Sequence, residues 1–393
     1  MMIKRFFLIA SLSVLTMSFT AQAAVSSSCV APGTWFDPNQ KSNIPTATML
    51  SQLKNQDVIM LGETHDVADH HRWQMQTIAQ LYAQRPDMVL GFESFPRRLQ
   101  PVLDKWVAGN LSEDEFIKQS EWNTVWKYDP KLYLPLFHFA RINHVPMVAL
   151  NVDKKLTNKI SKLGWKAIPK DERLGLGNPK PPSQEYLDML GEIYALHSND
   201  KNIKTKDDPQ FSNFVDVQVT WDRAMAEAMV NTKTTAQMVA IAGRGHLENG
   251  YGIPHQLTDL GVTKFSVLIP WDSERPCDDL NTNIATAVFG LKSIETVKAA
   301  PKPRLGVMIE TAKAGGVYIN NVVKTSVAEA SGLLKDDVIT FAAGQHMRTA
   351  GDLIKTVQAM APGTWLPLIV RRGADTVDIV ARFPHKAKKP NHP

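Results

Sequence analysis

Apolar and polar positions follow a regular pattern over the first two thirds of the chain. Five short apolar runs have the length of buried strands: residues 58–61, 88–92, 146–150, 237–242 and 265–269. Apolar positions three and four residues apart predict helices between them, among them 46–53, a helix that begins near residue 68, 99–108 and 214–230. Strands that alternate with helices predict an α/β fold, a mostly parallel sheet flanked by helices, which the fifth strand is expected to close.

The stretch from residue 154 to residue 210 is irregular. Two segments rich in Pro and Lys, 169–183 and 198–209, flank a single amphipathic helix at 184–197. A lone helix between two such segments predicts a helical lid on flexible arms. The helix that follows holds Gln218 and Asp222 one turn apart.

Polar side chains follow three of the predicted strands directly. Glu63 and His65 come after the first strand, Glu93 after the second and His246 after the fourth. His65 and His246 are each the last residue of a Gly-x-x-His sequence. Since ligands bind at the carboxyl ends of parallel strands, we expect His65, Glu93 and His246 to surround one pocket, with Glu63 beside them.

One interpretation of this pocket is a metal site. Two His with one or two Glu suit a divalent ion such as zinc or manganese, with an open position for water. The metal ligands would be His65, Glu93 and His246. Because a metal-bound water attacks amides and esters, Glu63, His65, Glu93 and His246 would then form the catalytic set of a hydrolase.

The other interpretation, a haem site, is implied by the family resemblance given at the end of this subsection; haem needs an axial His or Tyr and a broad apolar slot. The candidate haem-binding residues are His65, His246, Tyr251, Tyr186 and Arg97. Tyr251 is the first choice for the axial ligand, and the rivals on the lid are Tyr186, Tyr194 and His197. Arg97 and Arg141 are candidates for pairing with haem propionates, with ordinary salt bridges as the alternative.

Other histidines and aromatic residues have a structural interpretation. We expect structural or surface roles for His70, His71, His138 and His144. His70 and His71 are neighbours on a predicted helix, so at most one is expected to face the strand end. The dense aromatic residues between 122 and 139 are interpreted as packed core.

The N-terminus predicts export. Lys4 and Arg5 precede an apolar run at 6–15, and an Ala-x-Ala cleavage site ends at Ala23, so residues 1–23 are expected to be a signal peptide and the protein periplasmic. The tripeptide before Cys29 does not fit a lipid-attachment site. Cys29 and Cys277 are the two cysteines of the chain and are expected to pair in an oxidising compartment, the alternative being two buried thiols.

Charge and hydropathy argue against two further classes of protein, those that bind nucleic acid and those that span a membrane. Removing residues 1–23 leaves 42 basic and 39 acidic side chains, a formal charge of +3, which does not imply nucleic-acid binding. After residue 23 no apolar run approaches the roughly 20 residues that span a bilayer, so the mature chain is not expected to be membrane-spanning.

The last quarter of the chain has a different composition. Residues 292–303, with several Lys, Ala and Pro, are expected to form a linker. Five β-rich runs follow, interrupted by a predicted helix at 350–360: 305–310, 317–323, 337–341, 366–371 and 376–383. Residues 385–393 are expected to be a disordered tail.

Residues 46–270 resemble the ChaN-like haem-binding-uptake family of the Tiki superfamily. Six segments carry the likeness: LGETHD at 61–66, GFESFPR at 91–97, YLPLFHFAR at 133–141, VPMVALNVD at 145–153, VTWDRAMAEAM at 219–229 and AGRGHLENGYGIP at 242–254. The resemblance implies that residues 24–291 form a periplasmic haem-binding domain for iron acquisition, with haem stacked as a pair across a homodimer. In the wider superfamily the positions of His65, Glu93 and His246, with Glu63 adjoining, resemble those of metal-dependent peptidases, and more distant relatives hydrolyse esters.

Residues 304–384 resemble a PDZ domain of the kind attached to periplasmic proteases. The likeness lies in RLGV at 304–307, TSVAEASGLLKDDVITFAAG at 325–344 and APGTWLPLIVRRG at 361–373. It implies that the C-terminus of a peptide or protein partner adds as a strand beside residues 305–309, with Leu305, Gly306 and Val307 binding its carboxylate and the helix at 350–360 forming the other wall. The alternative is a domain that packs on its own chain or stabilises a dimer.

Overall fold

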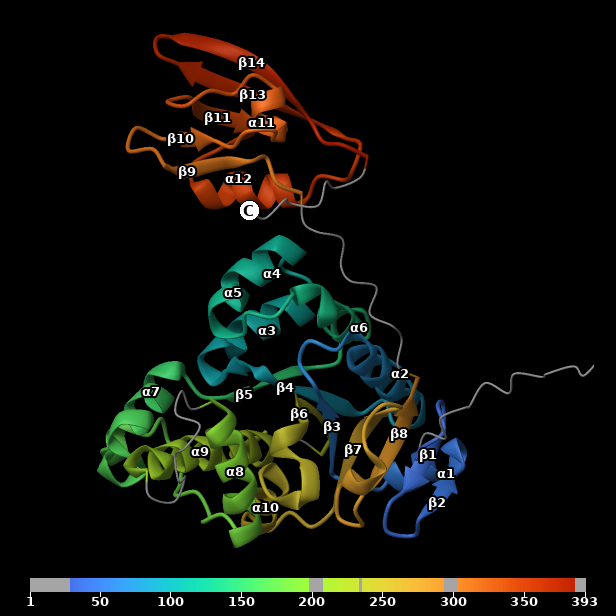
Figure 1. Cartoon of the computed structure of the whole chain (residues 1–393). Coiled ribbons are helices and arrows are strands. Elements are labelled where there is room, and N and C mark those ends of the chain that lie inside the picture. The colour runs from blue at the N-terminus through green and yellow to red at the C-terminus, as the bar shows by residue number, and fades with distance from the viewer. Residues whose placement is uncertain (1–28, 198–207, 233–234, 293–302, 386–393) are drawn as a thin grey trace, which may run out of the picture. The chain divides into compact units, whose positions relative to one another are not determined.

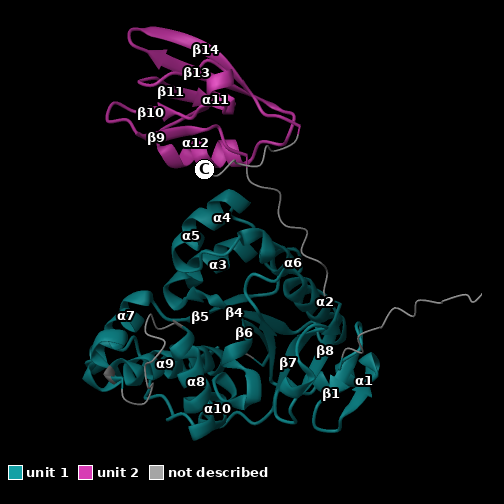
Figure 2. Cartoon of the chain, viewed as in Figure 1, with its two compact units in different colours: residues 1–293 teal, residues 294–393 magenta. Residues whose placement is uncertain are grey.

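A computed structural model describes residues 29–197, 208–232, 235–292 and 303–385. The chain divides into two compact units, residues 1–293 and 294–393 (Figure 2). The expected signal peptide lies outside the described residues, as do the interior of the expected linker and the expected tail after residue 385. Within the described ranges, no helix combines the length and apolar character needed to cross a membrane.

Unit 1 is built on one eight-stranded sheet in the order β2-β1-β8-β7-β3-β6-β4-β5. Its six strands from β8 to β5 run parallel, and β1 and β2 add an antiparallel edge beside β8. The strands are β1 (Trp35–Asp37), β2 (Ser42–Ile44), β3 (Val58–Glu63), β4 (Met88–Pro96), β5 (Met147–Asn151), β6 (Gln237–Gly243), β7 (Phe265–Asp272) and β8 (Ala287–Leu291).

Helices cover both faces of this sheet (Figure 1). They are α1 (Thr46–Leu53), α2 (Ala68–Gln84), α3 (Gln100–Val107), α4 (Glu113–Gln119), α5 (Trp122–Val125), α6 (Leu134–Ile142), α7 (Lys154–Leu163), α8 (Gln184–His197), α9 (Pro209–Asn231) and α10 (Ile253–Asp259). The predicted mostly parallel α/β fold is confirmed, and the predicted helices at 46–53 and 184–197 coincide with α1 and α8.

Two cores form because successive strand residues point to opposite faces. On β3, Ile59 and Leu61 join the aromatic cluster under α1 to α6, whereas Val58 and Met60 join the cluster under α9 and α10. All six residues of β3 are buried. A strand covered on both faces is therefore apolar throughout, which is the pattern that identified it in the sequence.

The fifth predicted strand does not close the sheet. It is β7, which lies between β3 and β8, and the sheet continues through β8, β1 and β2. These three strands are short, and β8 contains Gly290, which weakens a strand signal. Gly290 is needed there because a Cβ at this position would lie 2.2 Å from the carbonyl oxygen of Ala31.

A disulfide joins Cys29 to Cys277, 248 residues apart, with 5.5 Å between their Cα atoms. It connects the segment before β1 to η8 (Cys277–Asp279), a short 3₁₀ turn after β7. The chain segment that leads into the antiparallel edge is thus covalently attached to the parallel part of the sheet.

The irregular stretch contains more structure than its pattern indicates. Residues 154–163 form α7, which Asp153 caps by accepting a hydrogen bond from the Lys155 N–H at 2.9 Å. The segment before α8 is held by two 2.9 Å hydrogen bonds between the Lys180 backbone and the Gln256 side chain. α8 packs through Tyr186 and Leu190 against α9. Residues 198–207 lie outside the described residues.

Unit 2 is an antiparallel sheet in the order β14-β13-β11-β10-β9, with β12 paired to β11. Its elements are β9 (Val307–Thr311), β10 (Val317–Val322), α11 (Val327–Ala330), β11 (Val338–Ala342), β12 (Gln345–His346), α12 (Ala350–Gln358), β13 (Trp365–Arg372) and β14 (Asp375–Arg382). It has its own core, in which Leu353 of α12 packs with strand residues such as Ile319 and Leu368. The predicted β-rich C-terminal fold is confirmed.

Candidate functional site

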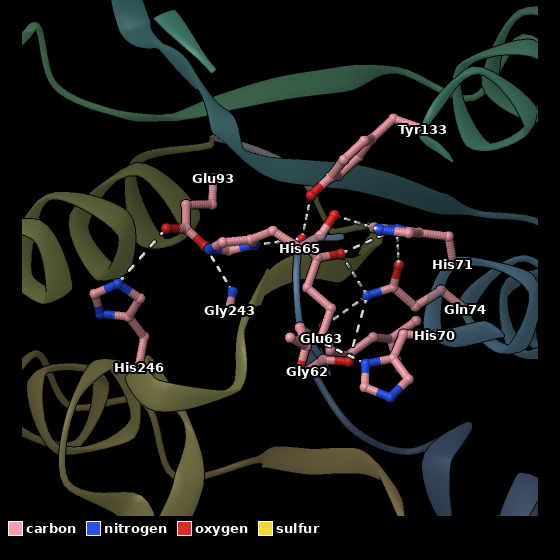
Figure 3. A network of polar contacts seen from close by, with 12 residues as sticks. Gly62, Glu63, His65, His70, His71, Gln74, Glu93, Tyr133, Gly243 and His246 are labelled. Carbon is pink, nitrogen blue, oxygen red and sulfur yellow. Dashed lines mark hydrogen bonds and ion pairs between the residues drawn. The ribbon is translucent and has the colours of Figure 1, made fainter. Parts of the chain in front are cut away.

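The order of the strands brings three polar strand ends together. β6 lies between β3 and β4, and all three run parallel, so their carboxyl ends share one edge. Glu93 lies inside β4, which runs on to Pro96 through an irregular pairing with β5. Such irregularities redirect side chains beside functional sites. Glu93 Oε2 accepts a hydrogen bond from the Gly243 N–H at 2.6 Å (Figure 3).

Glu63 is a buried carboxylate, and each of its two oxygens lies close to two potential hydrogen-bond donors. Its Oε1 atom accepts hydrogen bonds from the Tyr133 hydroxyl and, at 2.8 Å, from His65 Nδ1. Its Oε2 atom lies 3.1 Å from Gln74 Nε2 and 3.2 Å from His71 Nδ1. Burial raises the pKa of Glu63, but the hydrogen bond from His65 and the charges of His71 and His65 outweigh burial and leave this pKa below its usual value. Glu63 is therefore an anion that anchors its neighbours.

His65 is held between Glu63 and Glu93. Its ring packs against Trp126 and Tyr128, with centroids 4.7 and 5.2 Å away. Burial lowers the pKa of His65, but the hydrogen bond to Glu63 and the charge of Glu93 raise it by more. A Cβ on Gly243 would lie only 2.8 Å from His65 Cε1, so the ring fits because residue 243 is glycine.

His246 is placed in the same manner between a second buried acid, Asp222, and the shared Glu93. Its Nδ1 atom lies 2.6 Å from Oδ1 of the fully buried Asp222, and its Nε2 atom lies 3.6 Å from Glu93 Oε1. Burial lowers the pKa of His246, whereas the charges of Asp222 and Glu93 raise it, to about 9. The strand-end site thus contains two histidines, each bonded to its own buried acid, on either side of Glu93.

The three candidate tyrosines differ in what their hydroxyls do. Tyr186 is 1% exposed and donates to Asp222 Oδ2 at 2.8 Å, and Tyr194 donates to Asp208 at 2.5 Å. Tyr251 is half-buried with its ring centroid 5.9 Å from that of Tyr186. Among described residues, no hydrogen bond involves the Tyr251 hydroxyl. The side chain of His197 lies outside the described residues.

The two candidate arginines also differ. Arg97, in η1 (Arg97–Leu99), donates to the Ala224 carbonyl, while its buried Nε has no partner among the described residues. Burial lowers the pKa of Arg97 against an opposing effect of the Glu227 charge. Arg141 donates to the Leu111 carbonyl at 2.9 Å and lies over the Trp106 ring, away from the strand ends.

The expectation that at most one of His70 and His71 faces the strand end is wrong. His70 Nδ1 accepts from the Thr64 N–H at 2.9 Å, and His71 Nε2 lies 3.1 Å from the His65 carbonyl oxygen. Both rings contact backbone atoms of residues 64–65, in the segment between β3 and α2. His138 pairs with the exposed Glu113 instead, and His144 occupies a turn with φ of 53°.

No group of three or more His, Cys, Asp or Glu side chains is arranged to hold a metal ion in the part of the chain that the structure describes. A cavity of about 380 Å³ opens elsewhere, between α10 and the beginnings of β7 and β8. Residues such as Pro254, Phe265 and Thr286 line it, and none of the strand-end histidines or acids does. The strand-end site is therefore separate from this cavity.

Two contributors to the site carried no assigned role in the sequence. Asp222 is a carboxylate in the middle of a long helix, fully buried, and Tyr133 belongs to a segment that reads as aromatic core. The one sequence signal for Asp222 is a charged residue at an inward position of an otherwise apolar helix face. Tyr133 offers no such signal, because the sequence pattern does not distinguish a tyrosine whose hydroxyl has a specific partner from one that only packs in the core.

Comparison with known proteins assigns both units. A family model described as "Haem-binding uptake, Tiki superfamily, ChaN" matches residues 49–257, and a PDZ domain model matches residues 303–381. A search of curated proteins gives no significant match. The solved structure of ChaN of Campylobacter jejuni with cofacial heme is 20% identical, with a TM-score of 0.51, and the match covers 65% of this chain and 95% of that chain.

Two further solved structures match a smaller part of the chain. The HtrA3 PDZ domain bound to a phage-derived ligand is 23% identical over 21% of this chain and 84% of that chain, with a TM-score of 0.19. The serine endoprotease from Yersinia pestis is 16% identical over 21% of this chain and 29% of that chain, with a TM-score of 0.19.

The family model covers more than half of the sequence, its matched residues include the whole strand-end site, and the parallel sheet agrees with the ChaN structure. The chain belongs to the ChaN family of haem-binding uptake proteins in the Tiki superfamily and carries a PDZ domain at residues 303–381.

Proposed function

We propose that this protein binds haem in the periplasm as a step in iron uptake, with Tyr251 as the axial ligand. The observation that carries the proposal is the hydroxyl of Tyr251, which has no hydrogen-bond partner among the described residues, whereas Tyr186 and Tyr194 are bonded to acids. A phenolate oxygen is an established axial ligand of haem iron. When bound, the iron would supply the redox and ligand-binding chemistry of the cofactor.

The surroundings of Tyr251 fit this role. Tyr251 packs in an apolar cluster with residues of α8 and α9, among them Leu187, Ile193 and Phe214. An apolar wall is what a porphyrin ring requires on its faces. Arg97, whose Nε is not hydrogen-bonded to any described residue, remains the proposed partner for a propionate, since Arg141 is bonded to backbone carbonyls.

A haem titration of the full chain, followed by visible absorption, tests the proposal. We expect a Soret band in the wild type, and Tyr251→Phe should weaken haem binding at least tenfold, about 1.4 kcal/mol, and change the charge-transfer bands. Tyr194→Phe is the matched control, because it removes a hydroxyl already bonded to Asp208. Equal haem affinity and spectra for Tyr251→Phe and wild type would overturn the ligand assignment.

A metal-dependent hydrolase is the second candidate. What favours it is the pairing of His65 and His246 with buried acids, because carboxylates behind histidines are typical of metal ligands. In that case His65, Glu93 and His246 would hold zinc or manganese, with Glu63 adjoining. Stoichiometric metal without haem in protein purified from its own periplasm, together with peptidase or esterase activity that a chelator abolishes, would support this candidate over haem carriage.

The cellular setting is also proposed. The signal peptide expected at residues 1–23 and the disulfide both fit an oxidising compartment. Because the Campylobacter ChaN structure holds cofacial heme, we propose a homodimer of this protein that stacks two haems. Sedimentation with and without haem should show a haem-dependent rise in mass, and a monomer under both conditions would exclude it.

We propose that the PDZ domain recruits a protein partner by binding its C-terminus. The supporting feature is β9, which is an edge strand, with Met308 59% exposed on it and Ile354 46% exposed on α12. An edge strand beside a helix accepts an added peptide strand. Gly306, at φ of 85°, has no room for a Cβ, which would lie 2.2 Å from Ser326 Cβ.

Peptide binding to the full chain tests this role. Peptides with a free, apolar C-terminal residue should bind with modest affinity, and the same peptides with an amidated C-terminus should bind at least tenfold more weakly, since the Leu305-Gly306-Val307 turn would lose its carboxylate. If no free-acid peptide from a C-terminal library binds, the PDZ domain serves packing or dimerisation instead.

A further inference from the structure

The same chain of hydrogen bonds occurs twice in the strand-end site. In the first, the Tyr133 hydroxyl donates to Glu63, and Glu63 accepts from His65 Nδ1 at 2.8 Å. In the second, the Tyr186 hydroxyl donates to Asp222 at 2.8 Å, and Asp222 lies 2.6 Å from His246 Nδ1. We call these the Tyr133 relay and the Tyr186 relay.

The tyrosines and acids of both relays are buried. Tyr133 and Tyr186 are each 1% exposed, Glu63 is 2% exposed and Asp222 is fully buried. A buried carboxylate is costly unless its oxygens are satisfied, and here each acid receives both a hydroxyl and an imidazole donor. Their positions are therefore fixed by the fold before any ligand arrives.

In both relays the second ring nitrogen of the histidine lies on the side of the ring near Glu93. His246 Nε2 lies 3.6 Å from Glu93 Oε1. His65 Nε2 and Glu93 Oε2 lie 3.1 and 3.5 Å from the point where a Cβ of Gly243 would stand, which places both beside the same glycine. Figure 3 shows the two histidines on either side of Glu93.

We infer that Glu63 and Asp222 are positioning residues, each held by a buried tyrosine hydroxyl, that orient His65 and His246 so that both Nε2 atoms converge on Glu93. Tyr186 thereby acts through Asp222 and not as a haem ligand. The inference rests on the proposed function only in treating these histidines as part of the ligand site. Since Tyr186 also packs against Tyr251, the Tyr186 relay links the strand-end histidine to the proposed axial residue.

Nitrogen-15 NMR of the histidine side chains in the full chain without ligand tests the inference. We expect hydrogen-bonded, downfield Nδ1–H signals for His65 and His246. Asp222→Asn should abolish the downfield character of the His246 signal and leave that of His65 in place, and Glu63→Gln should do the reverse. Each variant thus serves as the control for the other.

Tyrosine variants keep the test valid if an acid variant fails to fold. Tyr186→Phe removes one buried hydroxyl and should shift the His246 Nδ1–H signal upfield, whereas Tyr194→Phe, on the same helix, should not. Unchanged His246 signals in both Asp222→Asn and Tyr186→Phe would overturn the inference. If the wild-type protein bound no haem, the proposed function would be rejected. The histidine NMR signals would still show whether the two relays exist.

Discussion

Gly243 shows how closely the side chains of the strand-end site are packed. A methyl group at this position would lie 2.8 Å from His65 Cε1 and 3.1 Å from its Nε2 atom, and the Gly243 N–H already binds Glu93. The His65 ring cannot easily move aside, because it is bonded to Glu63 and packed on Trp126. The first glycine of the second Gly-x-x-His piece is thus required by side-chain packing.

Gly243→Ala should therefore disturb the site, whereas Gly245→Ala should not, since a Cβ on Gly245 meets no atom within 4 Å. We expect Gly243→Ala to lower the free energy of unfolding of unit 1 by about 1–3 kcal/mol, the usual cost of overpacking, and to displace the NMR signals of His65. Denaturant titrations of both variants measure the difference. Equal stabilities and an unmoved His65 would show that the ring has space to shift.

The polar residues of the site were predictable to different degrees. Glu63, His65 and His246 lie at or just after strand ends, whereas Glu93 lies inside β4, and the structure brings all four to one edge. Asp222 lies on α9, outside the strands and 24 residues before His246, so no local pattern connects the two. Tyr133 and Tyr186 differ from packing tyrosines only through their hydroxyl partners, which depend on the tertiary fold. The positioning groups therefore required the structure.

At the scale of elements, strand signals were strong where both faces of a strand are buried and weak at the edge. β3 and β6 are buried along their whole length and read as apolar runs. β1 and β2 have three residues each, too few to show a period. The neighbours of a strand were not predictable either: that β6 separates β3 from β4 is set by long-range pairing and not by periodicity.

The disulfide compensates for the weakness of this edge. Cys29 lies six residues before β1, which pairs with β8 through two residue pairs. Closing a loop of 248 residues is worth roughly 5–6 kcal/mol in the chain-entropy model. The covalent link therefore secures an edge that hydrogen bonds alone hold weakly.

In unit 2 an ion pair between a buried aspartate and a partly exposed arginine connects two strands. Asp337, fully buried before β11, accepts hydrogen bonds of 2.8 Å from both Nε and Nη2 of Arg372 at the end of β13. Burial raises the pKa of Asp337, but the hydrogen bonds from Arg372 and the Leu334 N–H, with the charge of Arg372, leave it below its usual value of 3.8. The ionised carboxylate therefore stabilises the folded state.

The sign of the pH dependence follows from this lowered pKa. The contribution of Asp337 should be complete above pH 3.8 and lost as the pH falls through the lower pKa of the folded state. Asp337→Asn should destabilise unit 2 at neutral pH by about 1–3 kcal/mol and reduce its sensitivity to acid. Hydrogen exchange of the β11 and β13 amides measures this, with the exposed Asp378→Asn as control. Identical acid profiles for Asp337→Asn and wild type would contradict the assignment.

At the scale of the whole molecule, each unit has a core made only of its own residues. The clusters on the two faces of the unit 1 sheet contain residues up to 291, and the unit 2 cluster begins at Leu305. Eight of the nine tryptophans belong to unit 1, and the ninth, Trp365, is 62% exposed in unit 2. Burial of apolar side chains is the main source of stability, so separate cores imply separate cooperative transitions.

Calorimetry of the full chain should accordingly show two unfolding transitions, and tryptophan fluorescence should report mainly the transition of unit 1. Two glycine variants assign them. Gly306→Ala places a methyl group 2.2 Å from Ser326 Cβ at a φ of 85°, and should lower only the transition of unit 2. Gly243→Ala should lower only the transition that fluorescence follows. If both variants shifted one common transition, folding of the two units would be coupled, and the haem-binding and PDZ functions could not be assigned to independently stable parts.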